Sequence, residues 1–97
     1  MAIRALNEAE IAAEMKKAEL WRREGKEIVR VFAFGGFPES IRFVNAVAEA
    51  AEKADHHPDI LIQYSKVTLR LSTHDCGGLS NRDFALAKTA DELASRC

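Results

Sequence analysis

The sequence predicts an α+β fold, in which a four-stranded antiparallel sheet carries three helices on one face. Segments whose apolar residues recur every three to four positions stand beside pairs of segments that alternate apolar and polar residues, in the order α-β-β-α-β-β-α. Short turns separate the two strands of each pair, which favours antiparallel pairing because parallel strands need a long crossover. The chain has 97 residues, and we expect one domain over residues 1–97.

The first predicted helix covers about residues 8–18. Asn7 can cap it, because Glu10 stands three positions later and can return a hydrogen bond to the backbone of the cap. Apolar residues then recur at helical spacing up to Ala18. Trp21 follows in a short extended segment, which we take as the first strand.

A hairpin turn around Gly25 leads into the second predicted strand, from Glu27 to Phe34, which is rich in β-branched and aromatic residues. Residues 35–38 interrupt this strand, since Pro38 is excluded from a central strand but is tolerated at the start of a helix. The second predicted helix therefore covers about residues 39–54.

Apolar residues on this second helix cover more than the stripe of about 100° that packing on one sheet requires. Its polar residues form one narrow stripe, made of Arg42, Asn45, Glu49, Glu52 and Lys53. The other positions are Ile41, Phe43, Val44, Ala46, Val47, Ala48, Ala50, Ala51 and Ala54. We interpret the surplus as a contact between copies of the chain, in a homodimer or homotetramer. The alternative is that alanine is tolerated anywhere on a helix.

The second pair of strands follows the end of this helix at residues 55–59. The third predicted strand runs from Ile60 to Tyr64, with Tyr64 as a half-buried aromatic residue. A tight turn at residues 65–66 connects it to a fourth strand over residues 67–72, in which apolar and polar residues alternate.

The last predicted helix begins after Ser80 and follows a flexible loop over residues 75–78. Ser80 and Asp83 have the spacing of a capping box, so Asp83 is predicted to return a hydrogen bond to the cap or to offset the helix dipole. The apolar positions of this helix form two neighbouring rows, which are Phe84, Ala87, Ala90 or Asp91, and Ala94 in one row and Leu86 and Leu93 in the next.

The composition argues against a nucleic-acid partner and against a membrane protein. The formal net charge is −1, and glutamates interrupt the short basic clusters, so no broad basic surface is available for nucleic acid. No apolar run approaches the roughly 20 residues that span a bilayer. Residues 1–6 become polar too early for a secretory signal. We expect a cytoplasmic protein whose two cysteines, Cys76 and Cys97, are free thiols.

All three histidines of the chain, His56, His57 and His74, lie within one stretch of the sequence. Histidine gives or takes a proton near neutral pH, so this clustering suggests proton-transfer chemistry at one site. His56 and His57 follow a helix C-terminus, where the dipole favours a protonated imidazole, or they serve only as helix caps. His74 precedes a glycine-rich loop, a common location for functional groups, or it is an exposed residue at the end of a strand.

Two other chemistries would use the same residues. His56, His57, His74 and Cys76 supply four potential zinc ligands, but their spacing fits none of the usual metal motifs. Cys76 would act as a nucleophile beside a histidine, although no neighbouring residue marks it as activated. We predict no bound metal.

The pattern Glu52-x3-His56-His57-Pro58-x5-Tyr64-x9-His74-x8-Asp83 resembles the signature of the pterin-4a-carbinolamine dehydratases. Trp21 and the phenylalanines over residues 32–37 are also similar to this family, so the resemblance spans nearly the whole chain. It implies a four-stranded antiparallel sheet with helices on one side. It also implies a dimer or a tetramer, with the second helix at the tetramer contact.

This resemblance implies the removal of water from a 4a-hydroxytetrahydropterin, giving a quinonoid dihydropterin, in the recycling of a tetrahydrobiopterin-type cofactor. No metal or organic cofactor is implied. A general acid would assist the departure of the hydroxyl group, and a base would take the proton of the neighbouring ring nitrogen. The alternative is a non-catalytic protein-binding or dimerisation module, since animal members of the family also bind a homeodomain transcription factor.

The resemblance also implies residue roles. His56 and His74 correspond to acid–base groups, and His57 to a catalytic-site residue that binds and orients the pterin. Substrate contacts are implied for these histidines and for Pro58, Thr73, Asp75, Cys76 and Arg82. Glu52, Tyr64 and Asp83 belong to the signature, with structural roles for the last two. Ile60 departs from the family, because animal members often carry an aromatic residue there.

Overall fold

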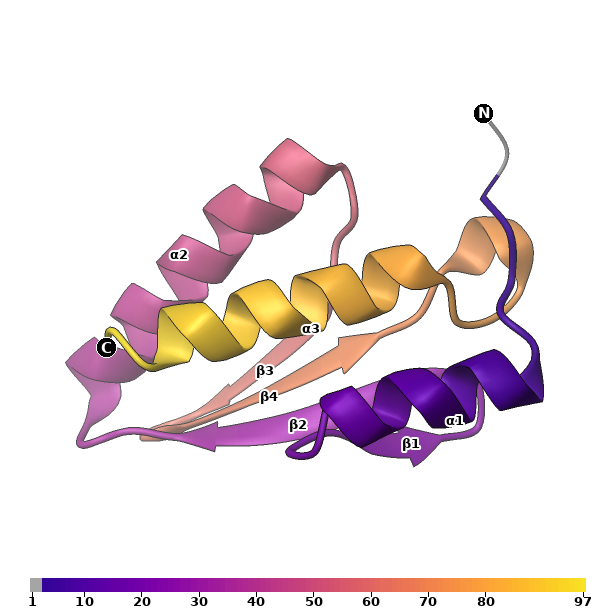
Figure 1. Cartoon of the computed structure of the whole chain (residues 1–97). Helices are drawn as coiled ribbons and strands as arrows, with labels where there is room; N and C mark the ends of the chain where they lie inside the picture. The colour runs from indigo at the N-terminus through magenta and orange to yellow at the C-terminus, as the bar shows by residue number, and fades with distance from the viewer. Residues whose placement is uncertain (1–2) are drawn as a thin grey trace.

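The computed structural model describes residues 3–97, so Met1 and Ala2, which open the segment compared above with a secretory signal, lie outside the described residues. The elements follow in the predicted order and confirm the α+β fold (Figure 1). They are α1 (Glu8–Lys17), β1 (Arg22–Glu24), β2 (Glu27–Ala33), α2 (Phe37–Ala54), β3 (Asp59–Gln63), β4 (Lys66–Leu71), a one-turn 3₁₀ helix η1 (His74–Cys76) and α3 (Asn81–Ala94). Within residues 3–97, no helix is both long enough and apolar enough to cross a membrane.

The sheet has the strand order β1-β2-β4-β3, and every neighbouring pair is antiparallel. The two hairpins are joined through β2 and β4, where Arg30 pairs with Leu69 and Phe32 with Val67. Because side chains alternate along a strand, one face of the sheet presents Ile28, Phe32 and Leu69 to the helices. The three helices lie over this face (Figure 1).

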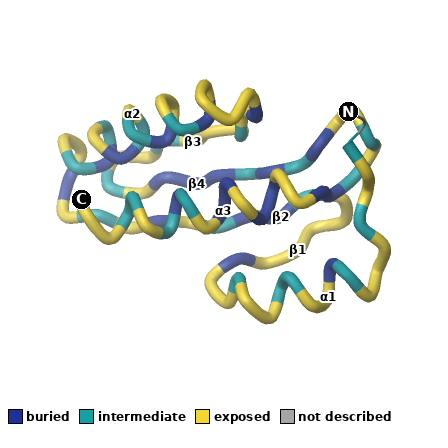
Figure 2. Tube along the Cα trace, turned by 45° about the horizontal axis from the view of Figure 1, so that its top comes forward, coloured by how far each residue is buried: buried dark blue, intermediate teal, exposed yellow. Residues whose placement is uncertain are grey.

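The core lies between the sheet and the helices, and the buried segments in Figure 2 face this layer. Three aromatic rings form its centre. The ring centroids of Phe32 and Phe43 are 4.6 Å apart, and Trp21 meets Phe32 edge-on at 5.9 Å. The indole N–H of Trp21 donates a hydrogen bond of 2.9 Å to Asp91 on α3, so the strand face and the last helix are tied together.

Both predicted capping boxes are confirmed. Asn7 caps α1 and Glu10 returns the bond, while Ser80 and Asp83 do the same for α3. The guanidinium of Arg4 and the backbone N–H of Asn7 both donate to Glu10, and they lower the pKa of this carboxyl to about 2. Each cap satisfies N–H groups that the first turn of a helix otherwise leaves without a partner.

The turn between β3 and β4 differs from the prediction. Tyr64 was expected at the end of the third strand, half-buried, with the turn at residues 65–66. Gln63 instead pairs with Lys66, so Tyr64 and Ser65 form the turn. Tyr64 has φ 54° and is 71% exposed. The prediction was wrong because apolar and polar residues continue to alternate into the turn. The residue type also gives no sign of a turn at Tyr64, since a positive φ is uncommon for an aromatic residue.

Helix α2 begins two residues earlier than predicted, at Phe37, with Gly36 at its N-cap. The row Phe43, Val47 and Ala51 is buried against the sheet. The other apolar positions counted above are half-buried or exposed, which leaves Ile41, Val44, Ala46, Ala48, Ala50 and Ala54 partly outside the core. Phe37 is 47% exposed. In a single copy of the chain, the apolar residues of this helix thus extend beyond the row that packs against the sheet, as predicted.

Candidate functional site

The three histidines lie around one hollow of about 220 Å³ at the end of the molecule where α2 and β4 finish. Two separate segments form most of its wall, the link between α2 and β3 and the segment that runs from the end of β4 into η1. The Arg82 side chain comes from the first turn of α3. The hollow is lined by Ile3, Asp55, His56, His57, Ser72, Thr73, His74, Asp75 and Arg82.

The end of α2 fixes the backbone that presents His56 and His57. Asp55 takes the left-handed conformation, with φ 50°, and the backbone N–H of His56 donates to the carbonyl of Ala51. This left-handed residue reverses the chain while satisfying the last carbonyls of the helix. Two consecutive histidines are therefore held at the rim of the hollow, one buried and the other exposed.

The segment that carries His74 is a hydrogen-bonded turn, because η1 and a bridge between Thr73 and Gly78 occupy the stretch where a loop over residues 75–78 was predicted. Thr73 and Gly78 form a bridge in which each N–H donates to the carbonyl of the other, at 2.9 and 3.3 Å. Gly77 has φ 73°, a conformation that glycine adopts without strain. The Cys76 thiol points back to the carbonyls of this same turn, at 3.5 Å from that of Thr73. Local hydrogen bonds therefore fix the position of His74.

Asp83 joins the segments that form the walls of the hollow. Its side chain is 0% exposed and accepts three hydrogen bonds, from Nε2 of His56 (2.6 Å), from the Thr73 hydroxyl (2.7 Å) and from the Ser80 backbone N–H (2.9 Å). The Ser80 hydroxyl in turn donates to Thr73 at 2.7 Å, because the single proton of Thr73 is already directed to Asp83. One carboxylate thus joins the end of α2, the end of β4 and the start of α3.

This network sets the proton positions on His56. Because the Asp83 carboxylate acts as acceptor for all its partners, Nε2 of His56 carries the hydrogen. Nδ1 of His56 makes no hydrogen bond within residues 3–97. Every fully enclosed side-chain nitrogen or oxygen of these residues has a partner, so Nδ1 is not fully enclosed and keeps contact with solvent. His56 itself is only 8% exposed. In the neutral ring, Nδ1 is therefore an accessible proton acceptor.

His57 is held by a different carboxylate. Its Nε2 lies 2.6 Å from Oε1 of Glu52, one turn back on α2, and both side chains are largely exposed. Glu52 therefore orients the His57 ring, which gives this signature residue a physical role. His74 is exposed and makes no side-chain hydrogen bond within the described residues, so both of its ring nitrogens are open to a ligand.

The structure brings together most, but not all, of the predicted site residues. Pro58 and Cys76 do not line the hollow, and Tyr64 lies beyond the far end of β3. Thr73 lines it, but its hydroxyl is engaged with Asp83. Sequence reasoning missed Ile3, Asp55 and Ser72. Asp55 and Ser72 adjoin predicted residues, whereas no local signal places Ile3 in this wall.

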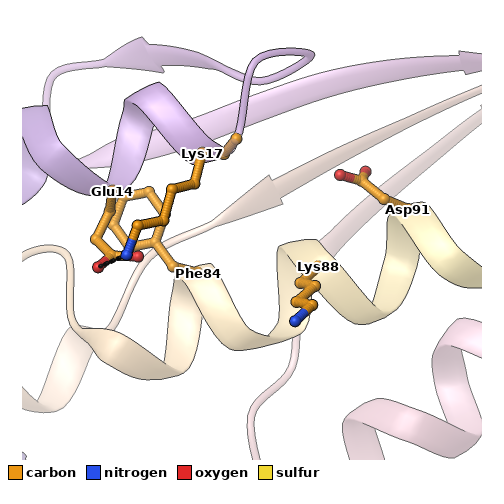
Figure 3. A pocket seen from close by; sticks show the side chains of 6 residues that line it. Glu14, Lys17, Phe84, Lys88 and Asp91 are labelled. Atoms are coloured by element: carbon orange, nitrogen blue, oxygen red, sulfur yellow. Dashed lines mark ion pairs between the residues drawn. The ribbon is translucent and has the colours of Figure 1, made fainter.

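A second hollow, of about 240 Å³, lies between α1 and α3, away from the histidines (Figure 3). Its wall includes Phe84, Lys88 and Asp91 from α3 and an ion pair between Glu14 and Lys17, 3.7 Å long. No imidazole or thiol lines it, so it lacks a group suited to proton exchange near neutral pH. Among residues 3–97, no three His, Cys, Asp or Glu side chains are grouped so that they could hold a metal ion.

Comparison with known proteins gives one consistent family. The family model described as pterin 4 alpha carbinolamine dehydratase matches residues 4–93. A protein of Chloroflexus aurantiacus, provisionally named as a pterin-4-alpha-carbinolamine dehydratase, is 52% identical over 91% of this chain and 95% of its own length. A protein of Thermomicrobium roseum with the same provisional name is 49% identical over 93% of this chain and 97% of its own length.

Two solved structures are also similar. A transcriptional coactivator/pterin dehydratase from Brucella melitensis superposes with a TM-score of 0.91 at 29% identity, over 94% of this chain and 99% of its own. A pterin dehydratase-like protein, identified as a RuBisCO assembly factor in the alpha-carboxysome, superposes with a TM-score of 0.66 at 30% identity. That match covers 76% of this chain and 88% of the other.

Proposed function

Since the chain belongs to the pterin 4 alpha carbinolamine dehydratase family, we propose that it removes water from a 4a-hydroxytetrahydropterin to give a quinonoid dihydropterin. The observation that carries this proposal is the convergence of His56, His57 and His74, from two separate segments, on one hollow. Imidazoles exchange protons near neutral pH, and this reaction consists of two proton transfers and the cleavage of one C–O bond.

The reaction needs no oxidant or reductant. The lone pair on N5 of the pterin forms a double bond to C4a while the bond from C4a to the hydroxyl oxygen breaks. A proton given to that hydroxyl lets it leave as water, and the proton on N5 passes to a base. A positioned acid or base each contributes roughly 10² to 10⁴ in rate.

We assign the base to His56 and the acid to His74. The hydrogen bond from Nε2 of His56 to Asp83 leaves Nδ1 as the nitrogen that can accept a proton. His74 lines the same hollow from another segment and has no intramolecular partner for its side chain within residues 3–97, so it can present a proton to the departing hydroxyl. His57, oriented by Glu52, and the cationic Arg82 would position the pterin.

A direct assay tests this function. We expect the purified protein to accelerate the decay of a 4a-hydroxytetrahydropterin, generated in the cuvette and followed by ultraviolet absorbance, at least tenfold over buffer. Heat-denatured protein at the same concentration is the control, because buffer components themselves catalyse proton transfer. A decay rate equal to that of the control at neutral pH would contradict the proposed function.

We also propose that the chain forms a homodimer or a homotetramer through the apolar side of α2. Phe37 is exposed and Val44 is half-buried on that side, and such surface favours burial against a second copy. Analytical ultracentrifugation should give a mass of two or four chains. Val44→Glu should lower this mass, whereas Asn45→Glu, on the polar stripe of the same helix, should leave it unchanged.

A monomeric wild-type protein would contradict this assembly. It would favour the second candidate function, a protein-binding module that uses the same side of α2. The names of the two structural neighbours, a coactivator and an assembly factor, support that candidate.

A further inference from the structure

The histidine hollow shares lining residues with two neighbouring hollows. One, of about 320 Å³, shares Ser72, Thr73 and His74 with it and extends to Lys26 in the β1–β2 turn. This turn and η1 lie at the same end of the molecule (Figure 1). We call this hollow of about 320 Å³ the hairpin hollow. The other, of about 150 Å³, shares His56 and Arg82 with the histidine hollow and runs between α2 and α3.

The position of the reacting carbon decides which parts of a pterin must enter these neighbours. C6 of the pterin is two bonds from C4a, through N5. If C4a and N5 lie beside the histidines, as the proposed function requires, any substituent on C6 leaves the ring close to them. A substituent longer than a methyl group must therefore continue into one of the two neighbouring hollows or into solvent.

The two neighbouring hollows differ in the side chains that line them. The wall between α2 and α3 is largely apolar and is formed by three alanines and Leu86. Its one hydroxyl, on Thr89, already donates to the carbonyl of Ala85, and His56 and Arg82 are shared with the histidine hollow. The hairpin hollow presents the ammonium of Lys26, and the Ser72 hydroxyl makes no hydrogen bond within residues 3–97. Glu27, the acidic residue of that wall, lies 3.6 Å from Arg70, which offsets its charge.

We propose, on the basis of the proposed function, that the hairpin hollow is the subsite for the C6 substituent and selects a polar, hydroxylated chain. Lys26 and Ser72 act there as hydrogen-bond donors to that chain. Gly78 lines this hollow, and it can be replaced without a clash, because a Cβ atom built on it meets no atom within 4 Å and its φ lies outside the strained positive range. A larger side chain at position 78 would therefore extend into space that the substituent occupies.

Binding of two stable dihydropterins tests the subsite. Calorimetry would compare a 7,8-dihydropterin that carries a 1,2-dihydroxypropyl group at C6 with one that carries a methyl group. In the wild-type protein we expect the dihydroxypropyl compound to bind about threefold to tenfold more tightly, the effect of one or two net hydrogen bonds. Lys26→Ala and Gly78→Leu should each bring the ratio of the two affinities close to one.

The controls separate this inference from the proposed function. Lys16→Ala removes the same charge from the exposed side of α1 and should leave the ratio as in the wild type. Thermal melting of Gly78→Leu checks its fold, and Lys26→Ala tests the subsite independently of it. Equal binding of both compounds to the wild-type protein would overturn the subsite alone. If neither compound binds, the proposed function fails as well.

Discussion

Asp83→Ala is expected to destabilise the protein by about 3–5 kcal/mol, because it removes a buried carboxylate and leaves its partners without an acceptor. The groups left without an acceptor are Nε2 of His56, the Thr73 hydroxyl and the Ser80 backbone N–H, all of them buried. Each unsatisfied buried donor costs about 1–3 kcal/mol. For a domain of this size the melting temperature should fall by roughly 4–8 °C per kcal/mol.

Asp83→Asn separates the stability of this network from its effect on catalysis. The amide oxygen can still accept from Thr73 and Ser80, but its NH₂ group would face Nε2 of His56. His56 must then accept at Nε2 and carry its hydrogen on Nδ1, the nitrogen assigned as the base. We expect a folded protein, destabilised by less than Asp83→Ala, whose dehydration rate falls at least tenfold.

Calorimetry and the dehydration assay on both variants check these expectations. Glu92→Ala, an exposed acidic position on the same helix, is the control and should change stability by no more than about 0.5 kcal/mol. A fully active Asp83→Asn protein would show that Nδ1 of His56 is not the proton acceptor. Wild-type stability in Asp83→Ala would mean that the three hydrogen bonds do not hold these segments together.

The order of elements could be predicted from the sequence because it depends on residues close together in the chain. The buried row Phe43, Val47 and Ala51 repeats at helical spacing, and Ser80 and Asp83 stand three positions apart as a capping box requires. The prediction failed at the turn between β3 and β4, because the backbone conformation of a single residue sets the position of that turn. Tyr64 takes a positive φ that its side chain does not favour, and the alternation of residues does not reveal it.

The site could be predicted only in part, for a related reason. The clustering of the three histidines in one stretch suggested that His74 and His56 share a site, and the family resemblance implied it, whereas the position of each residue by itself left a cap or surface role open. Asp83 was predicted as a cap, yet its bond to His56 joins positions 27 apart in the sequence. That bond depends on how α3 packs beside α2, a tertiary relation that no local pattern contains.

His74→Ala is expected to reduce the dehydration rate by at least tenfold, and by about 10² to 10⁴ if His74 is the sole acid for the departing hydroxyl. The fold should be unaffected, because this exposed side chain makes no hydrogen bond within residues 3–97, and the turn is closed by backbone groups of Thr73 and Gly78. His74→Ala should therefore lower turnover and leave the melting temperature unchanged, whereas Asp83→Ala is expected to lower both.

His74→Gln distinguishes proton transfer from simple binding. A glutamine side chain can donate a hydrogen bond to the pterin hydroxyl, but its amide does not exchange a proton near neutral pH. If His74 acts as the acid, Gln should be nearly as inactive as Ala under substrate saturation, while both variants retain affinity for a dihydropterin. Recovery of most of the wild-type turnover by Gln would reduce His74 to a binding residue. The acid would then have to be sought in the exposed His57, which shares the hollow and is already held by Glu52.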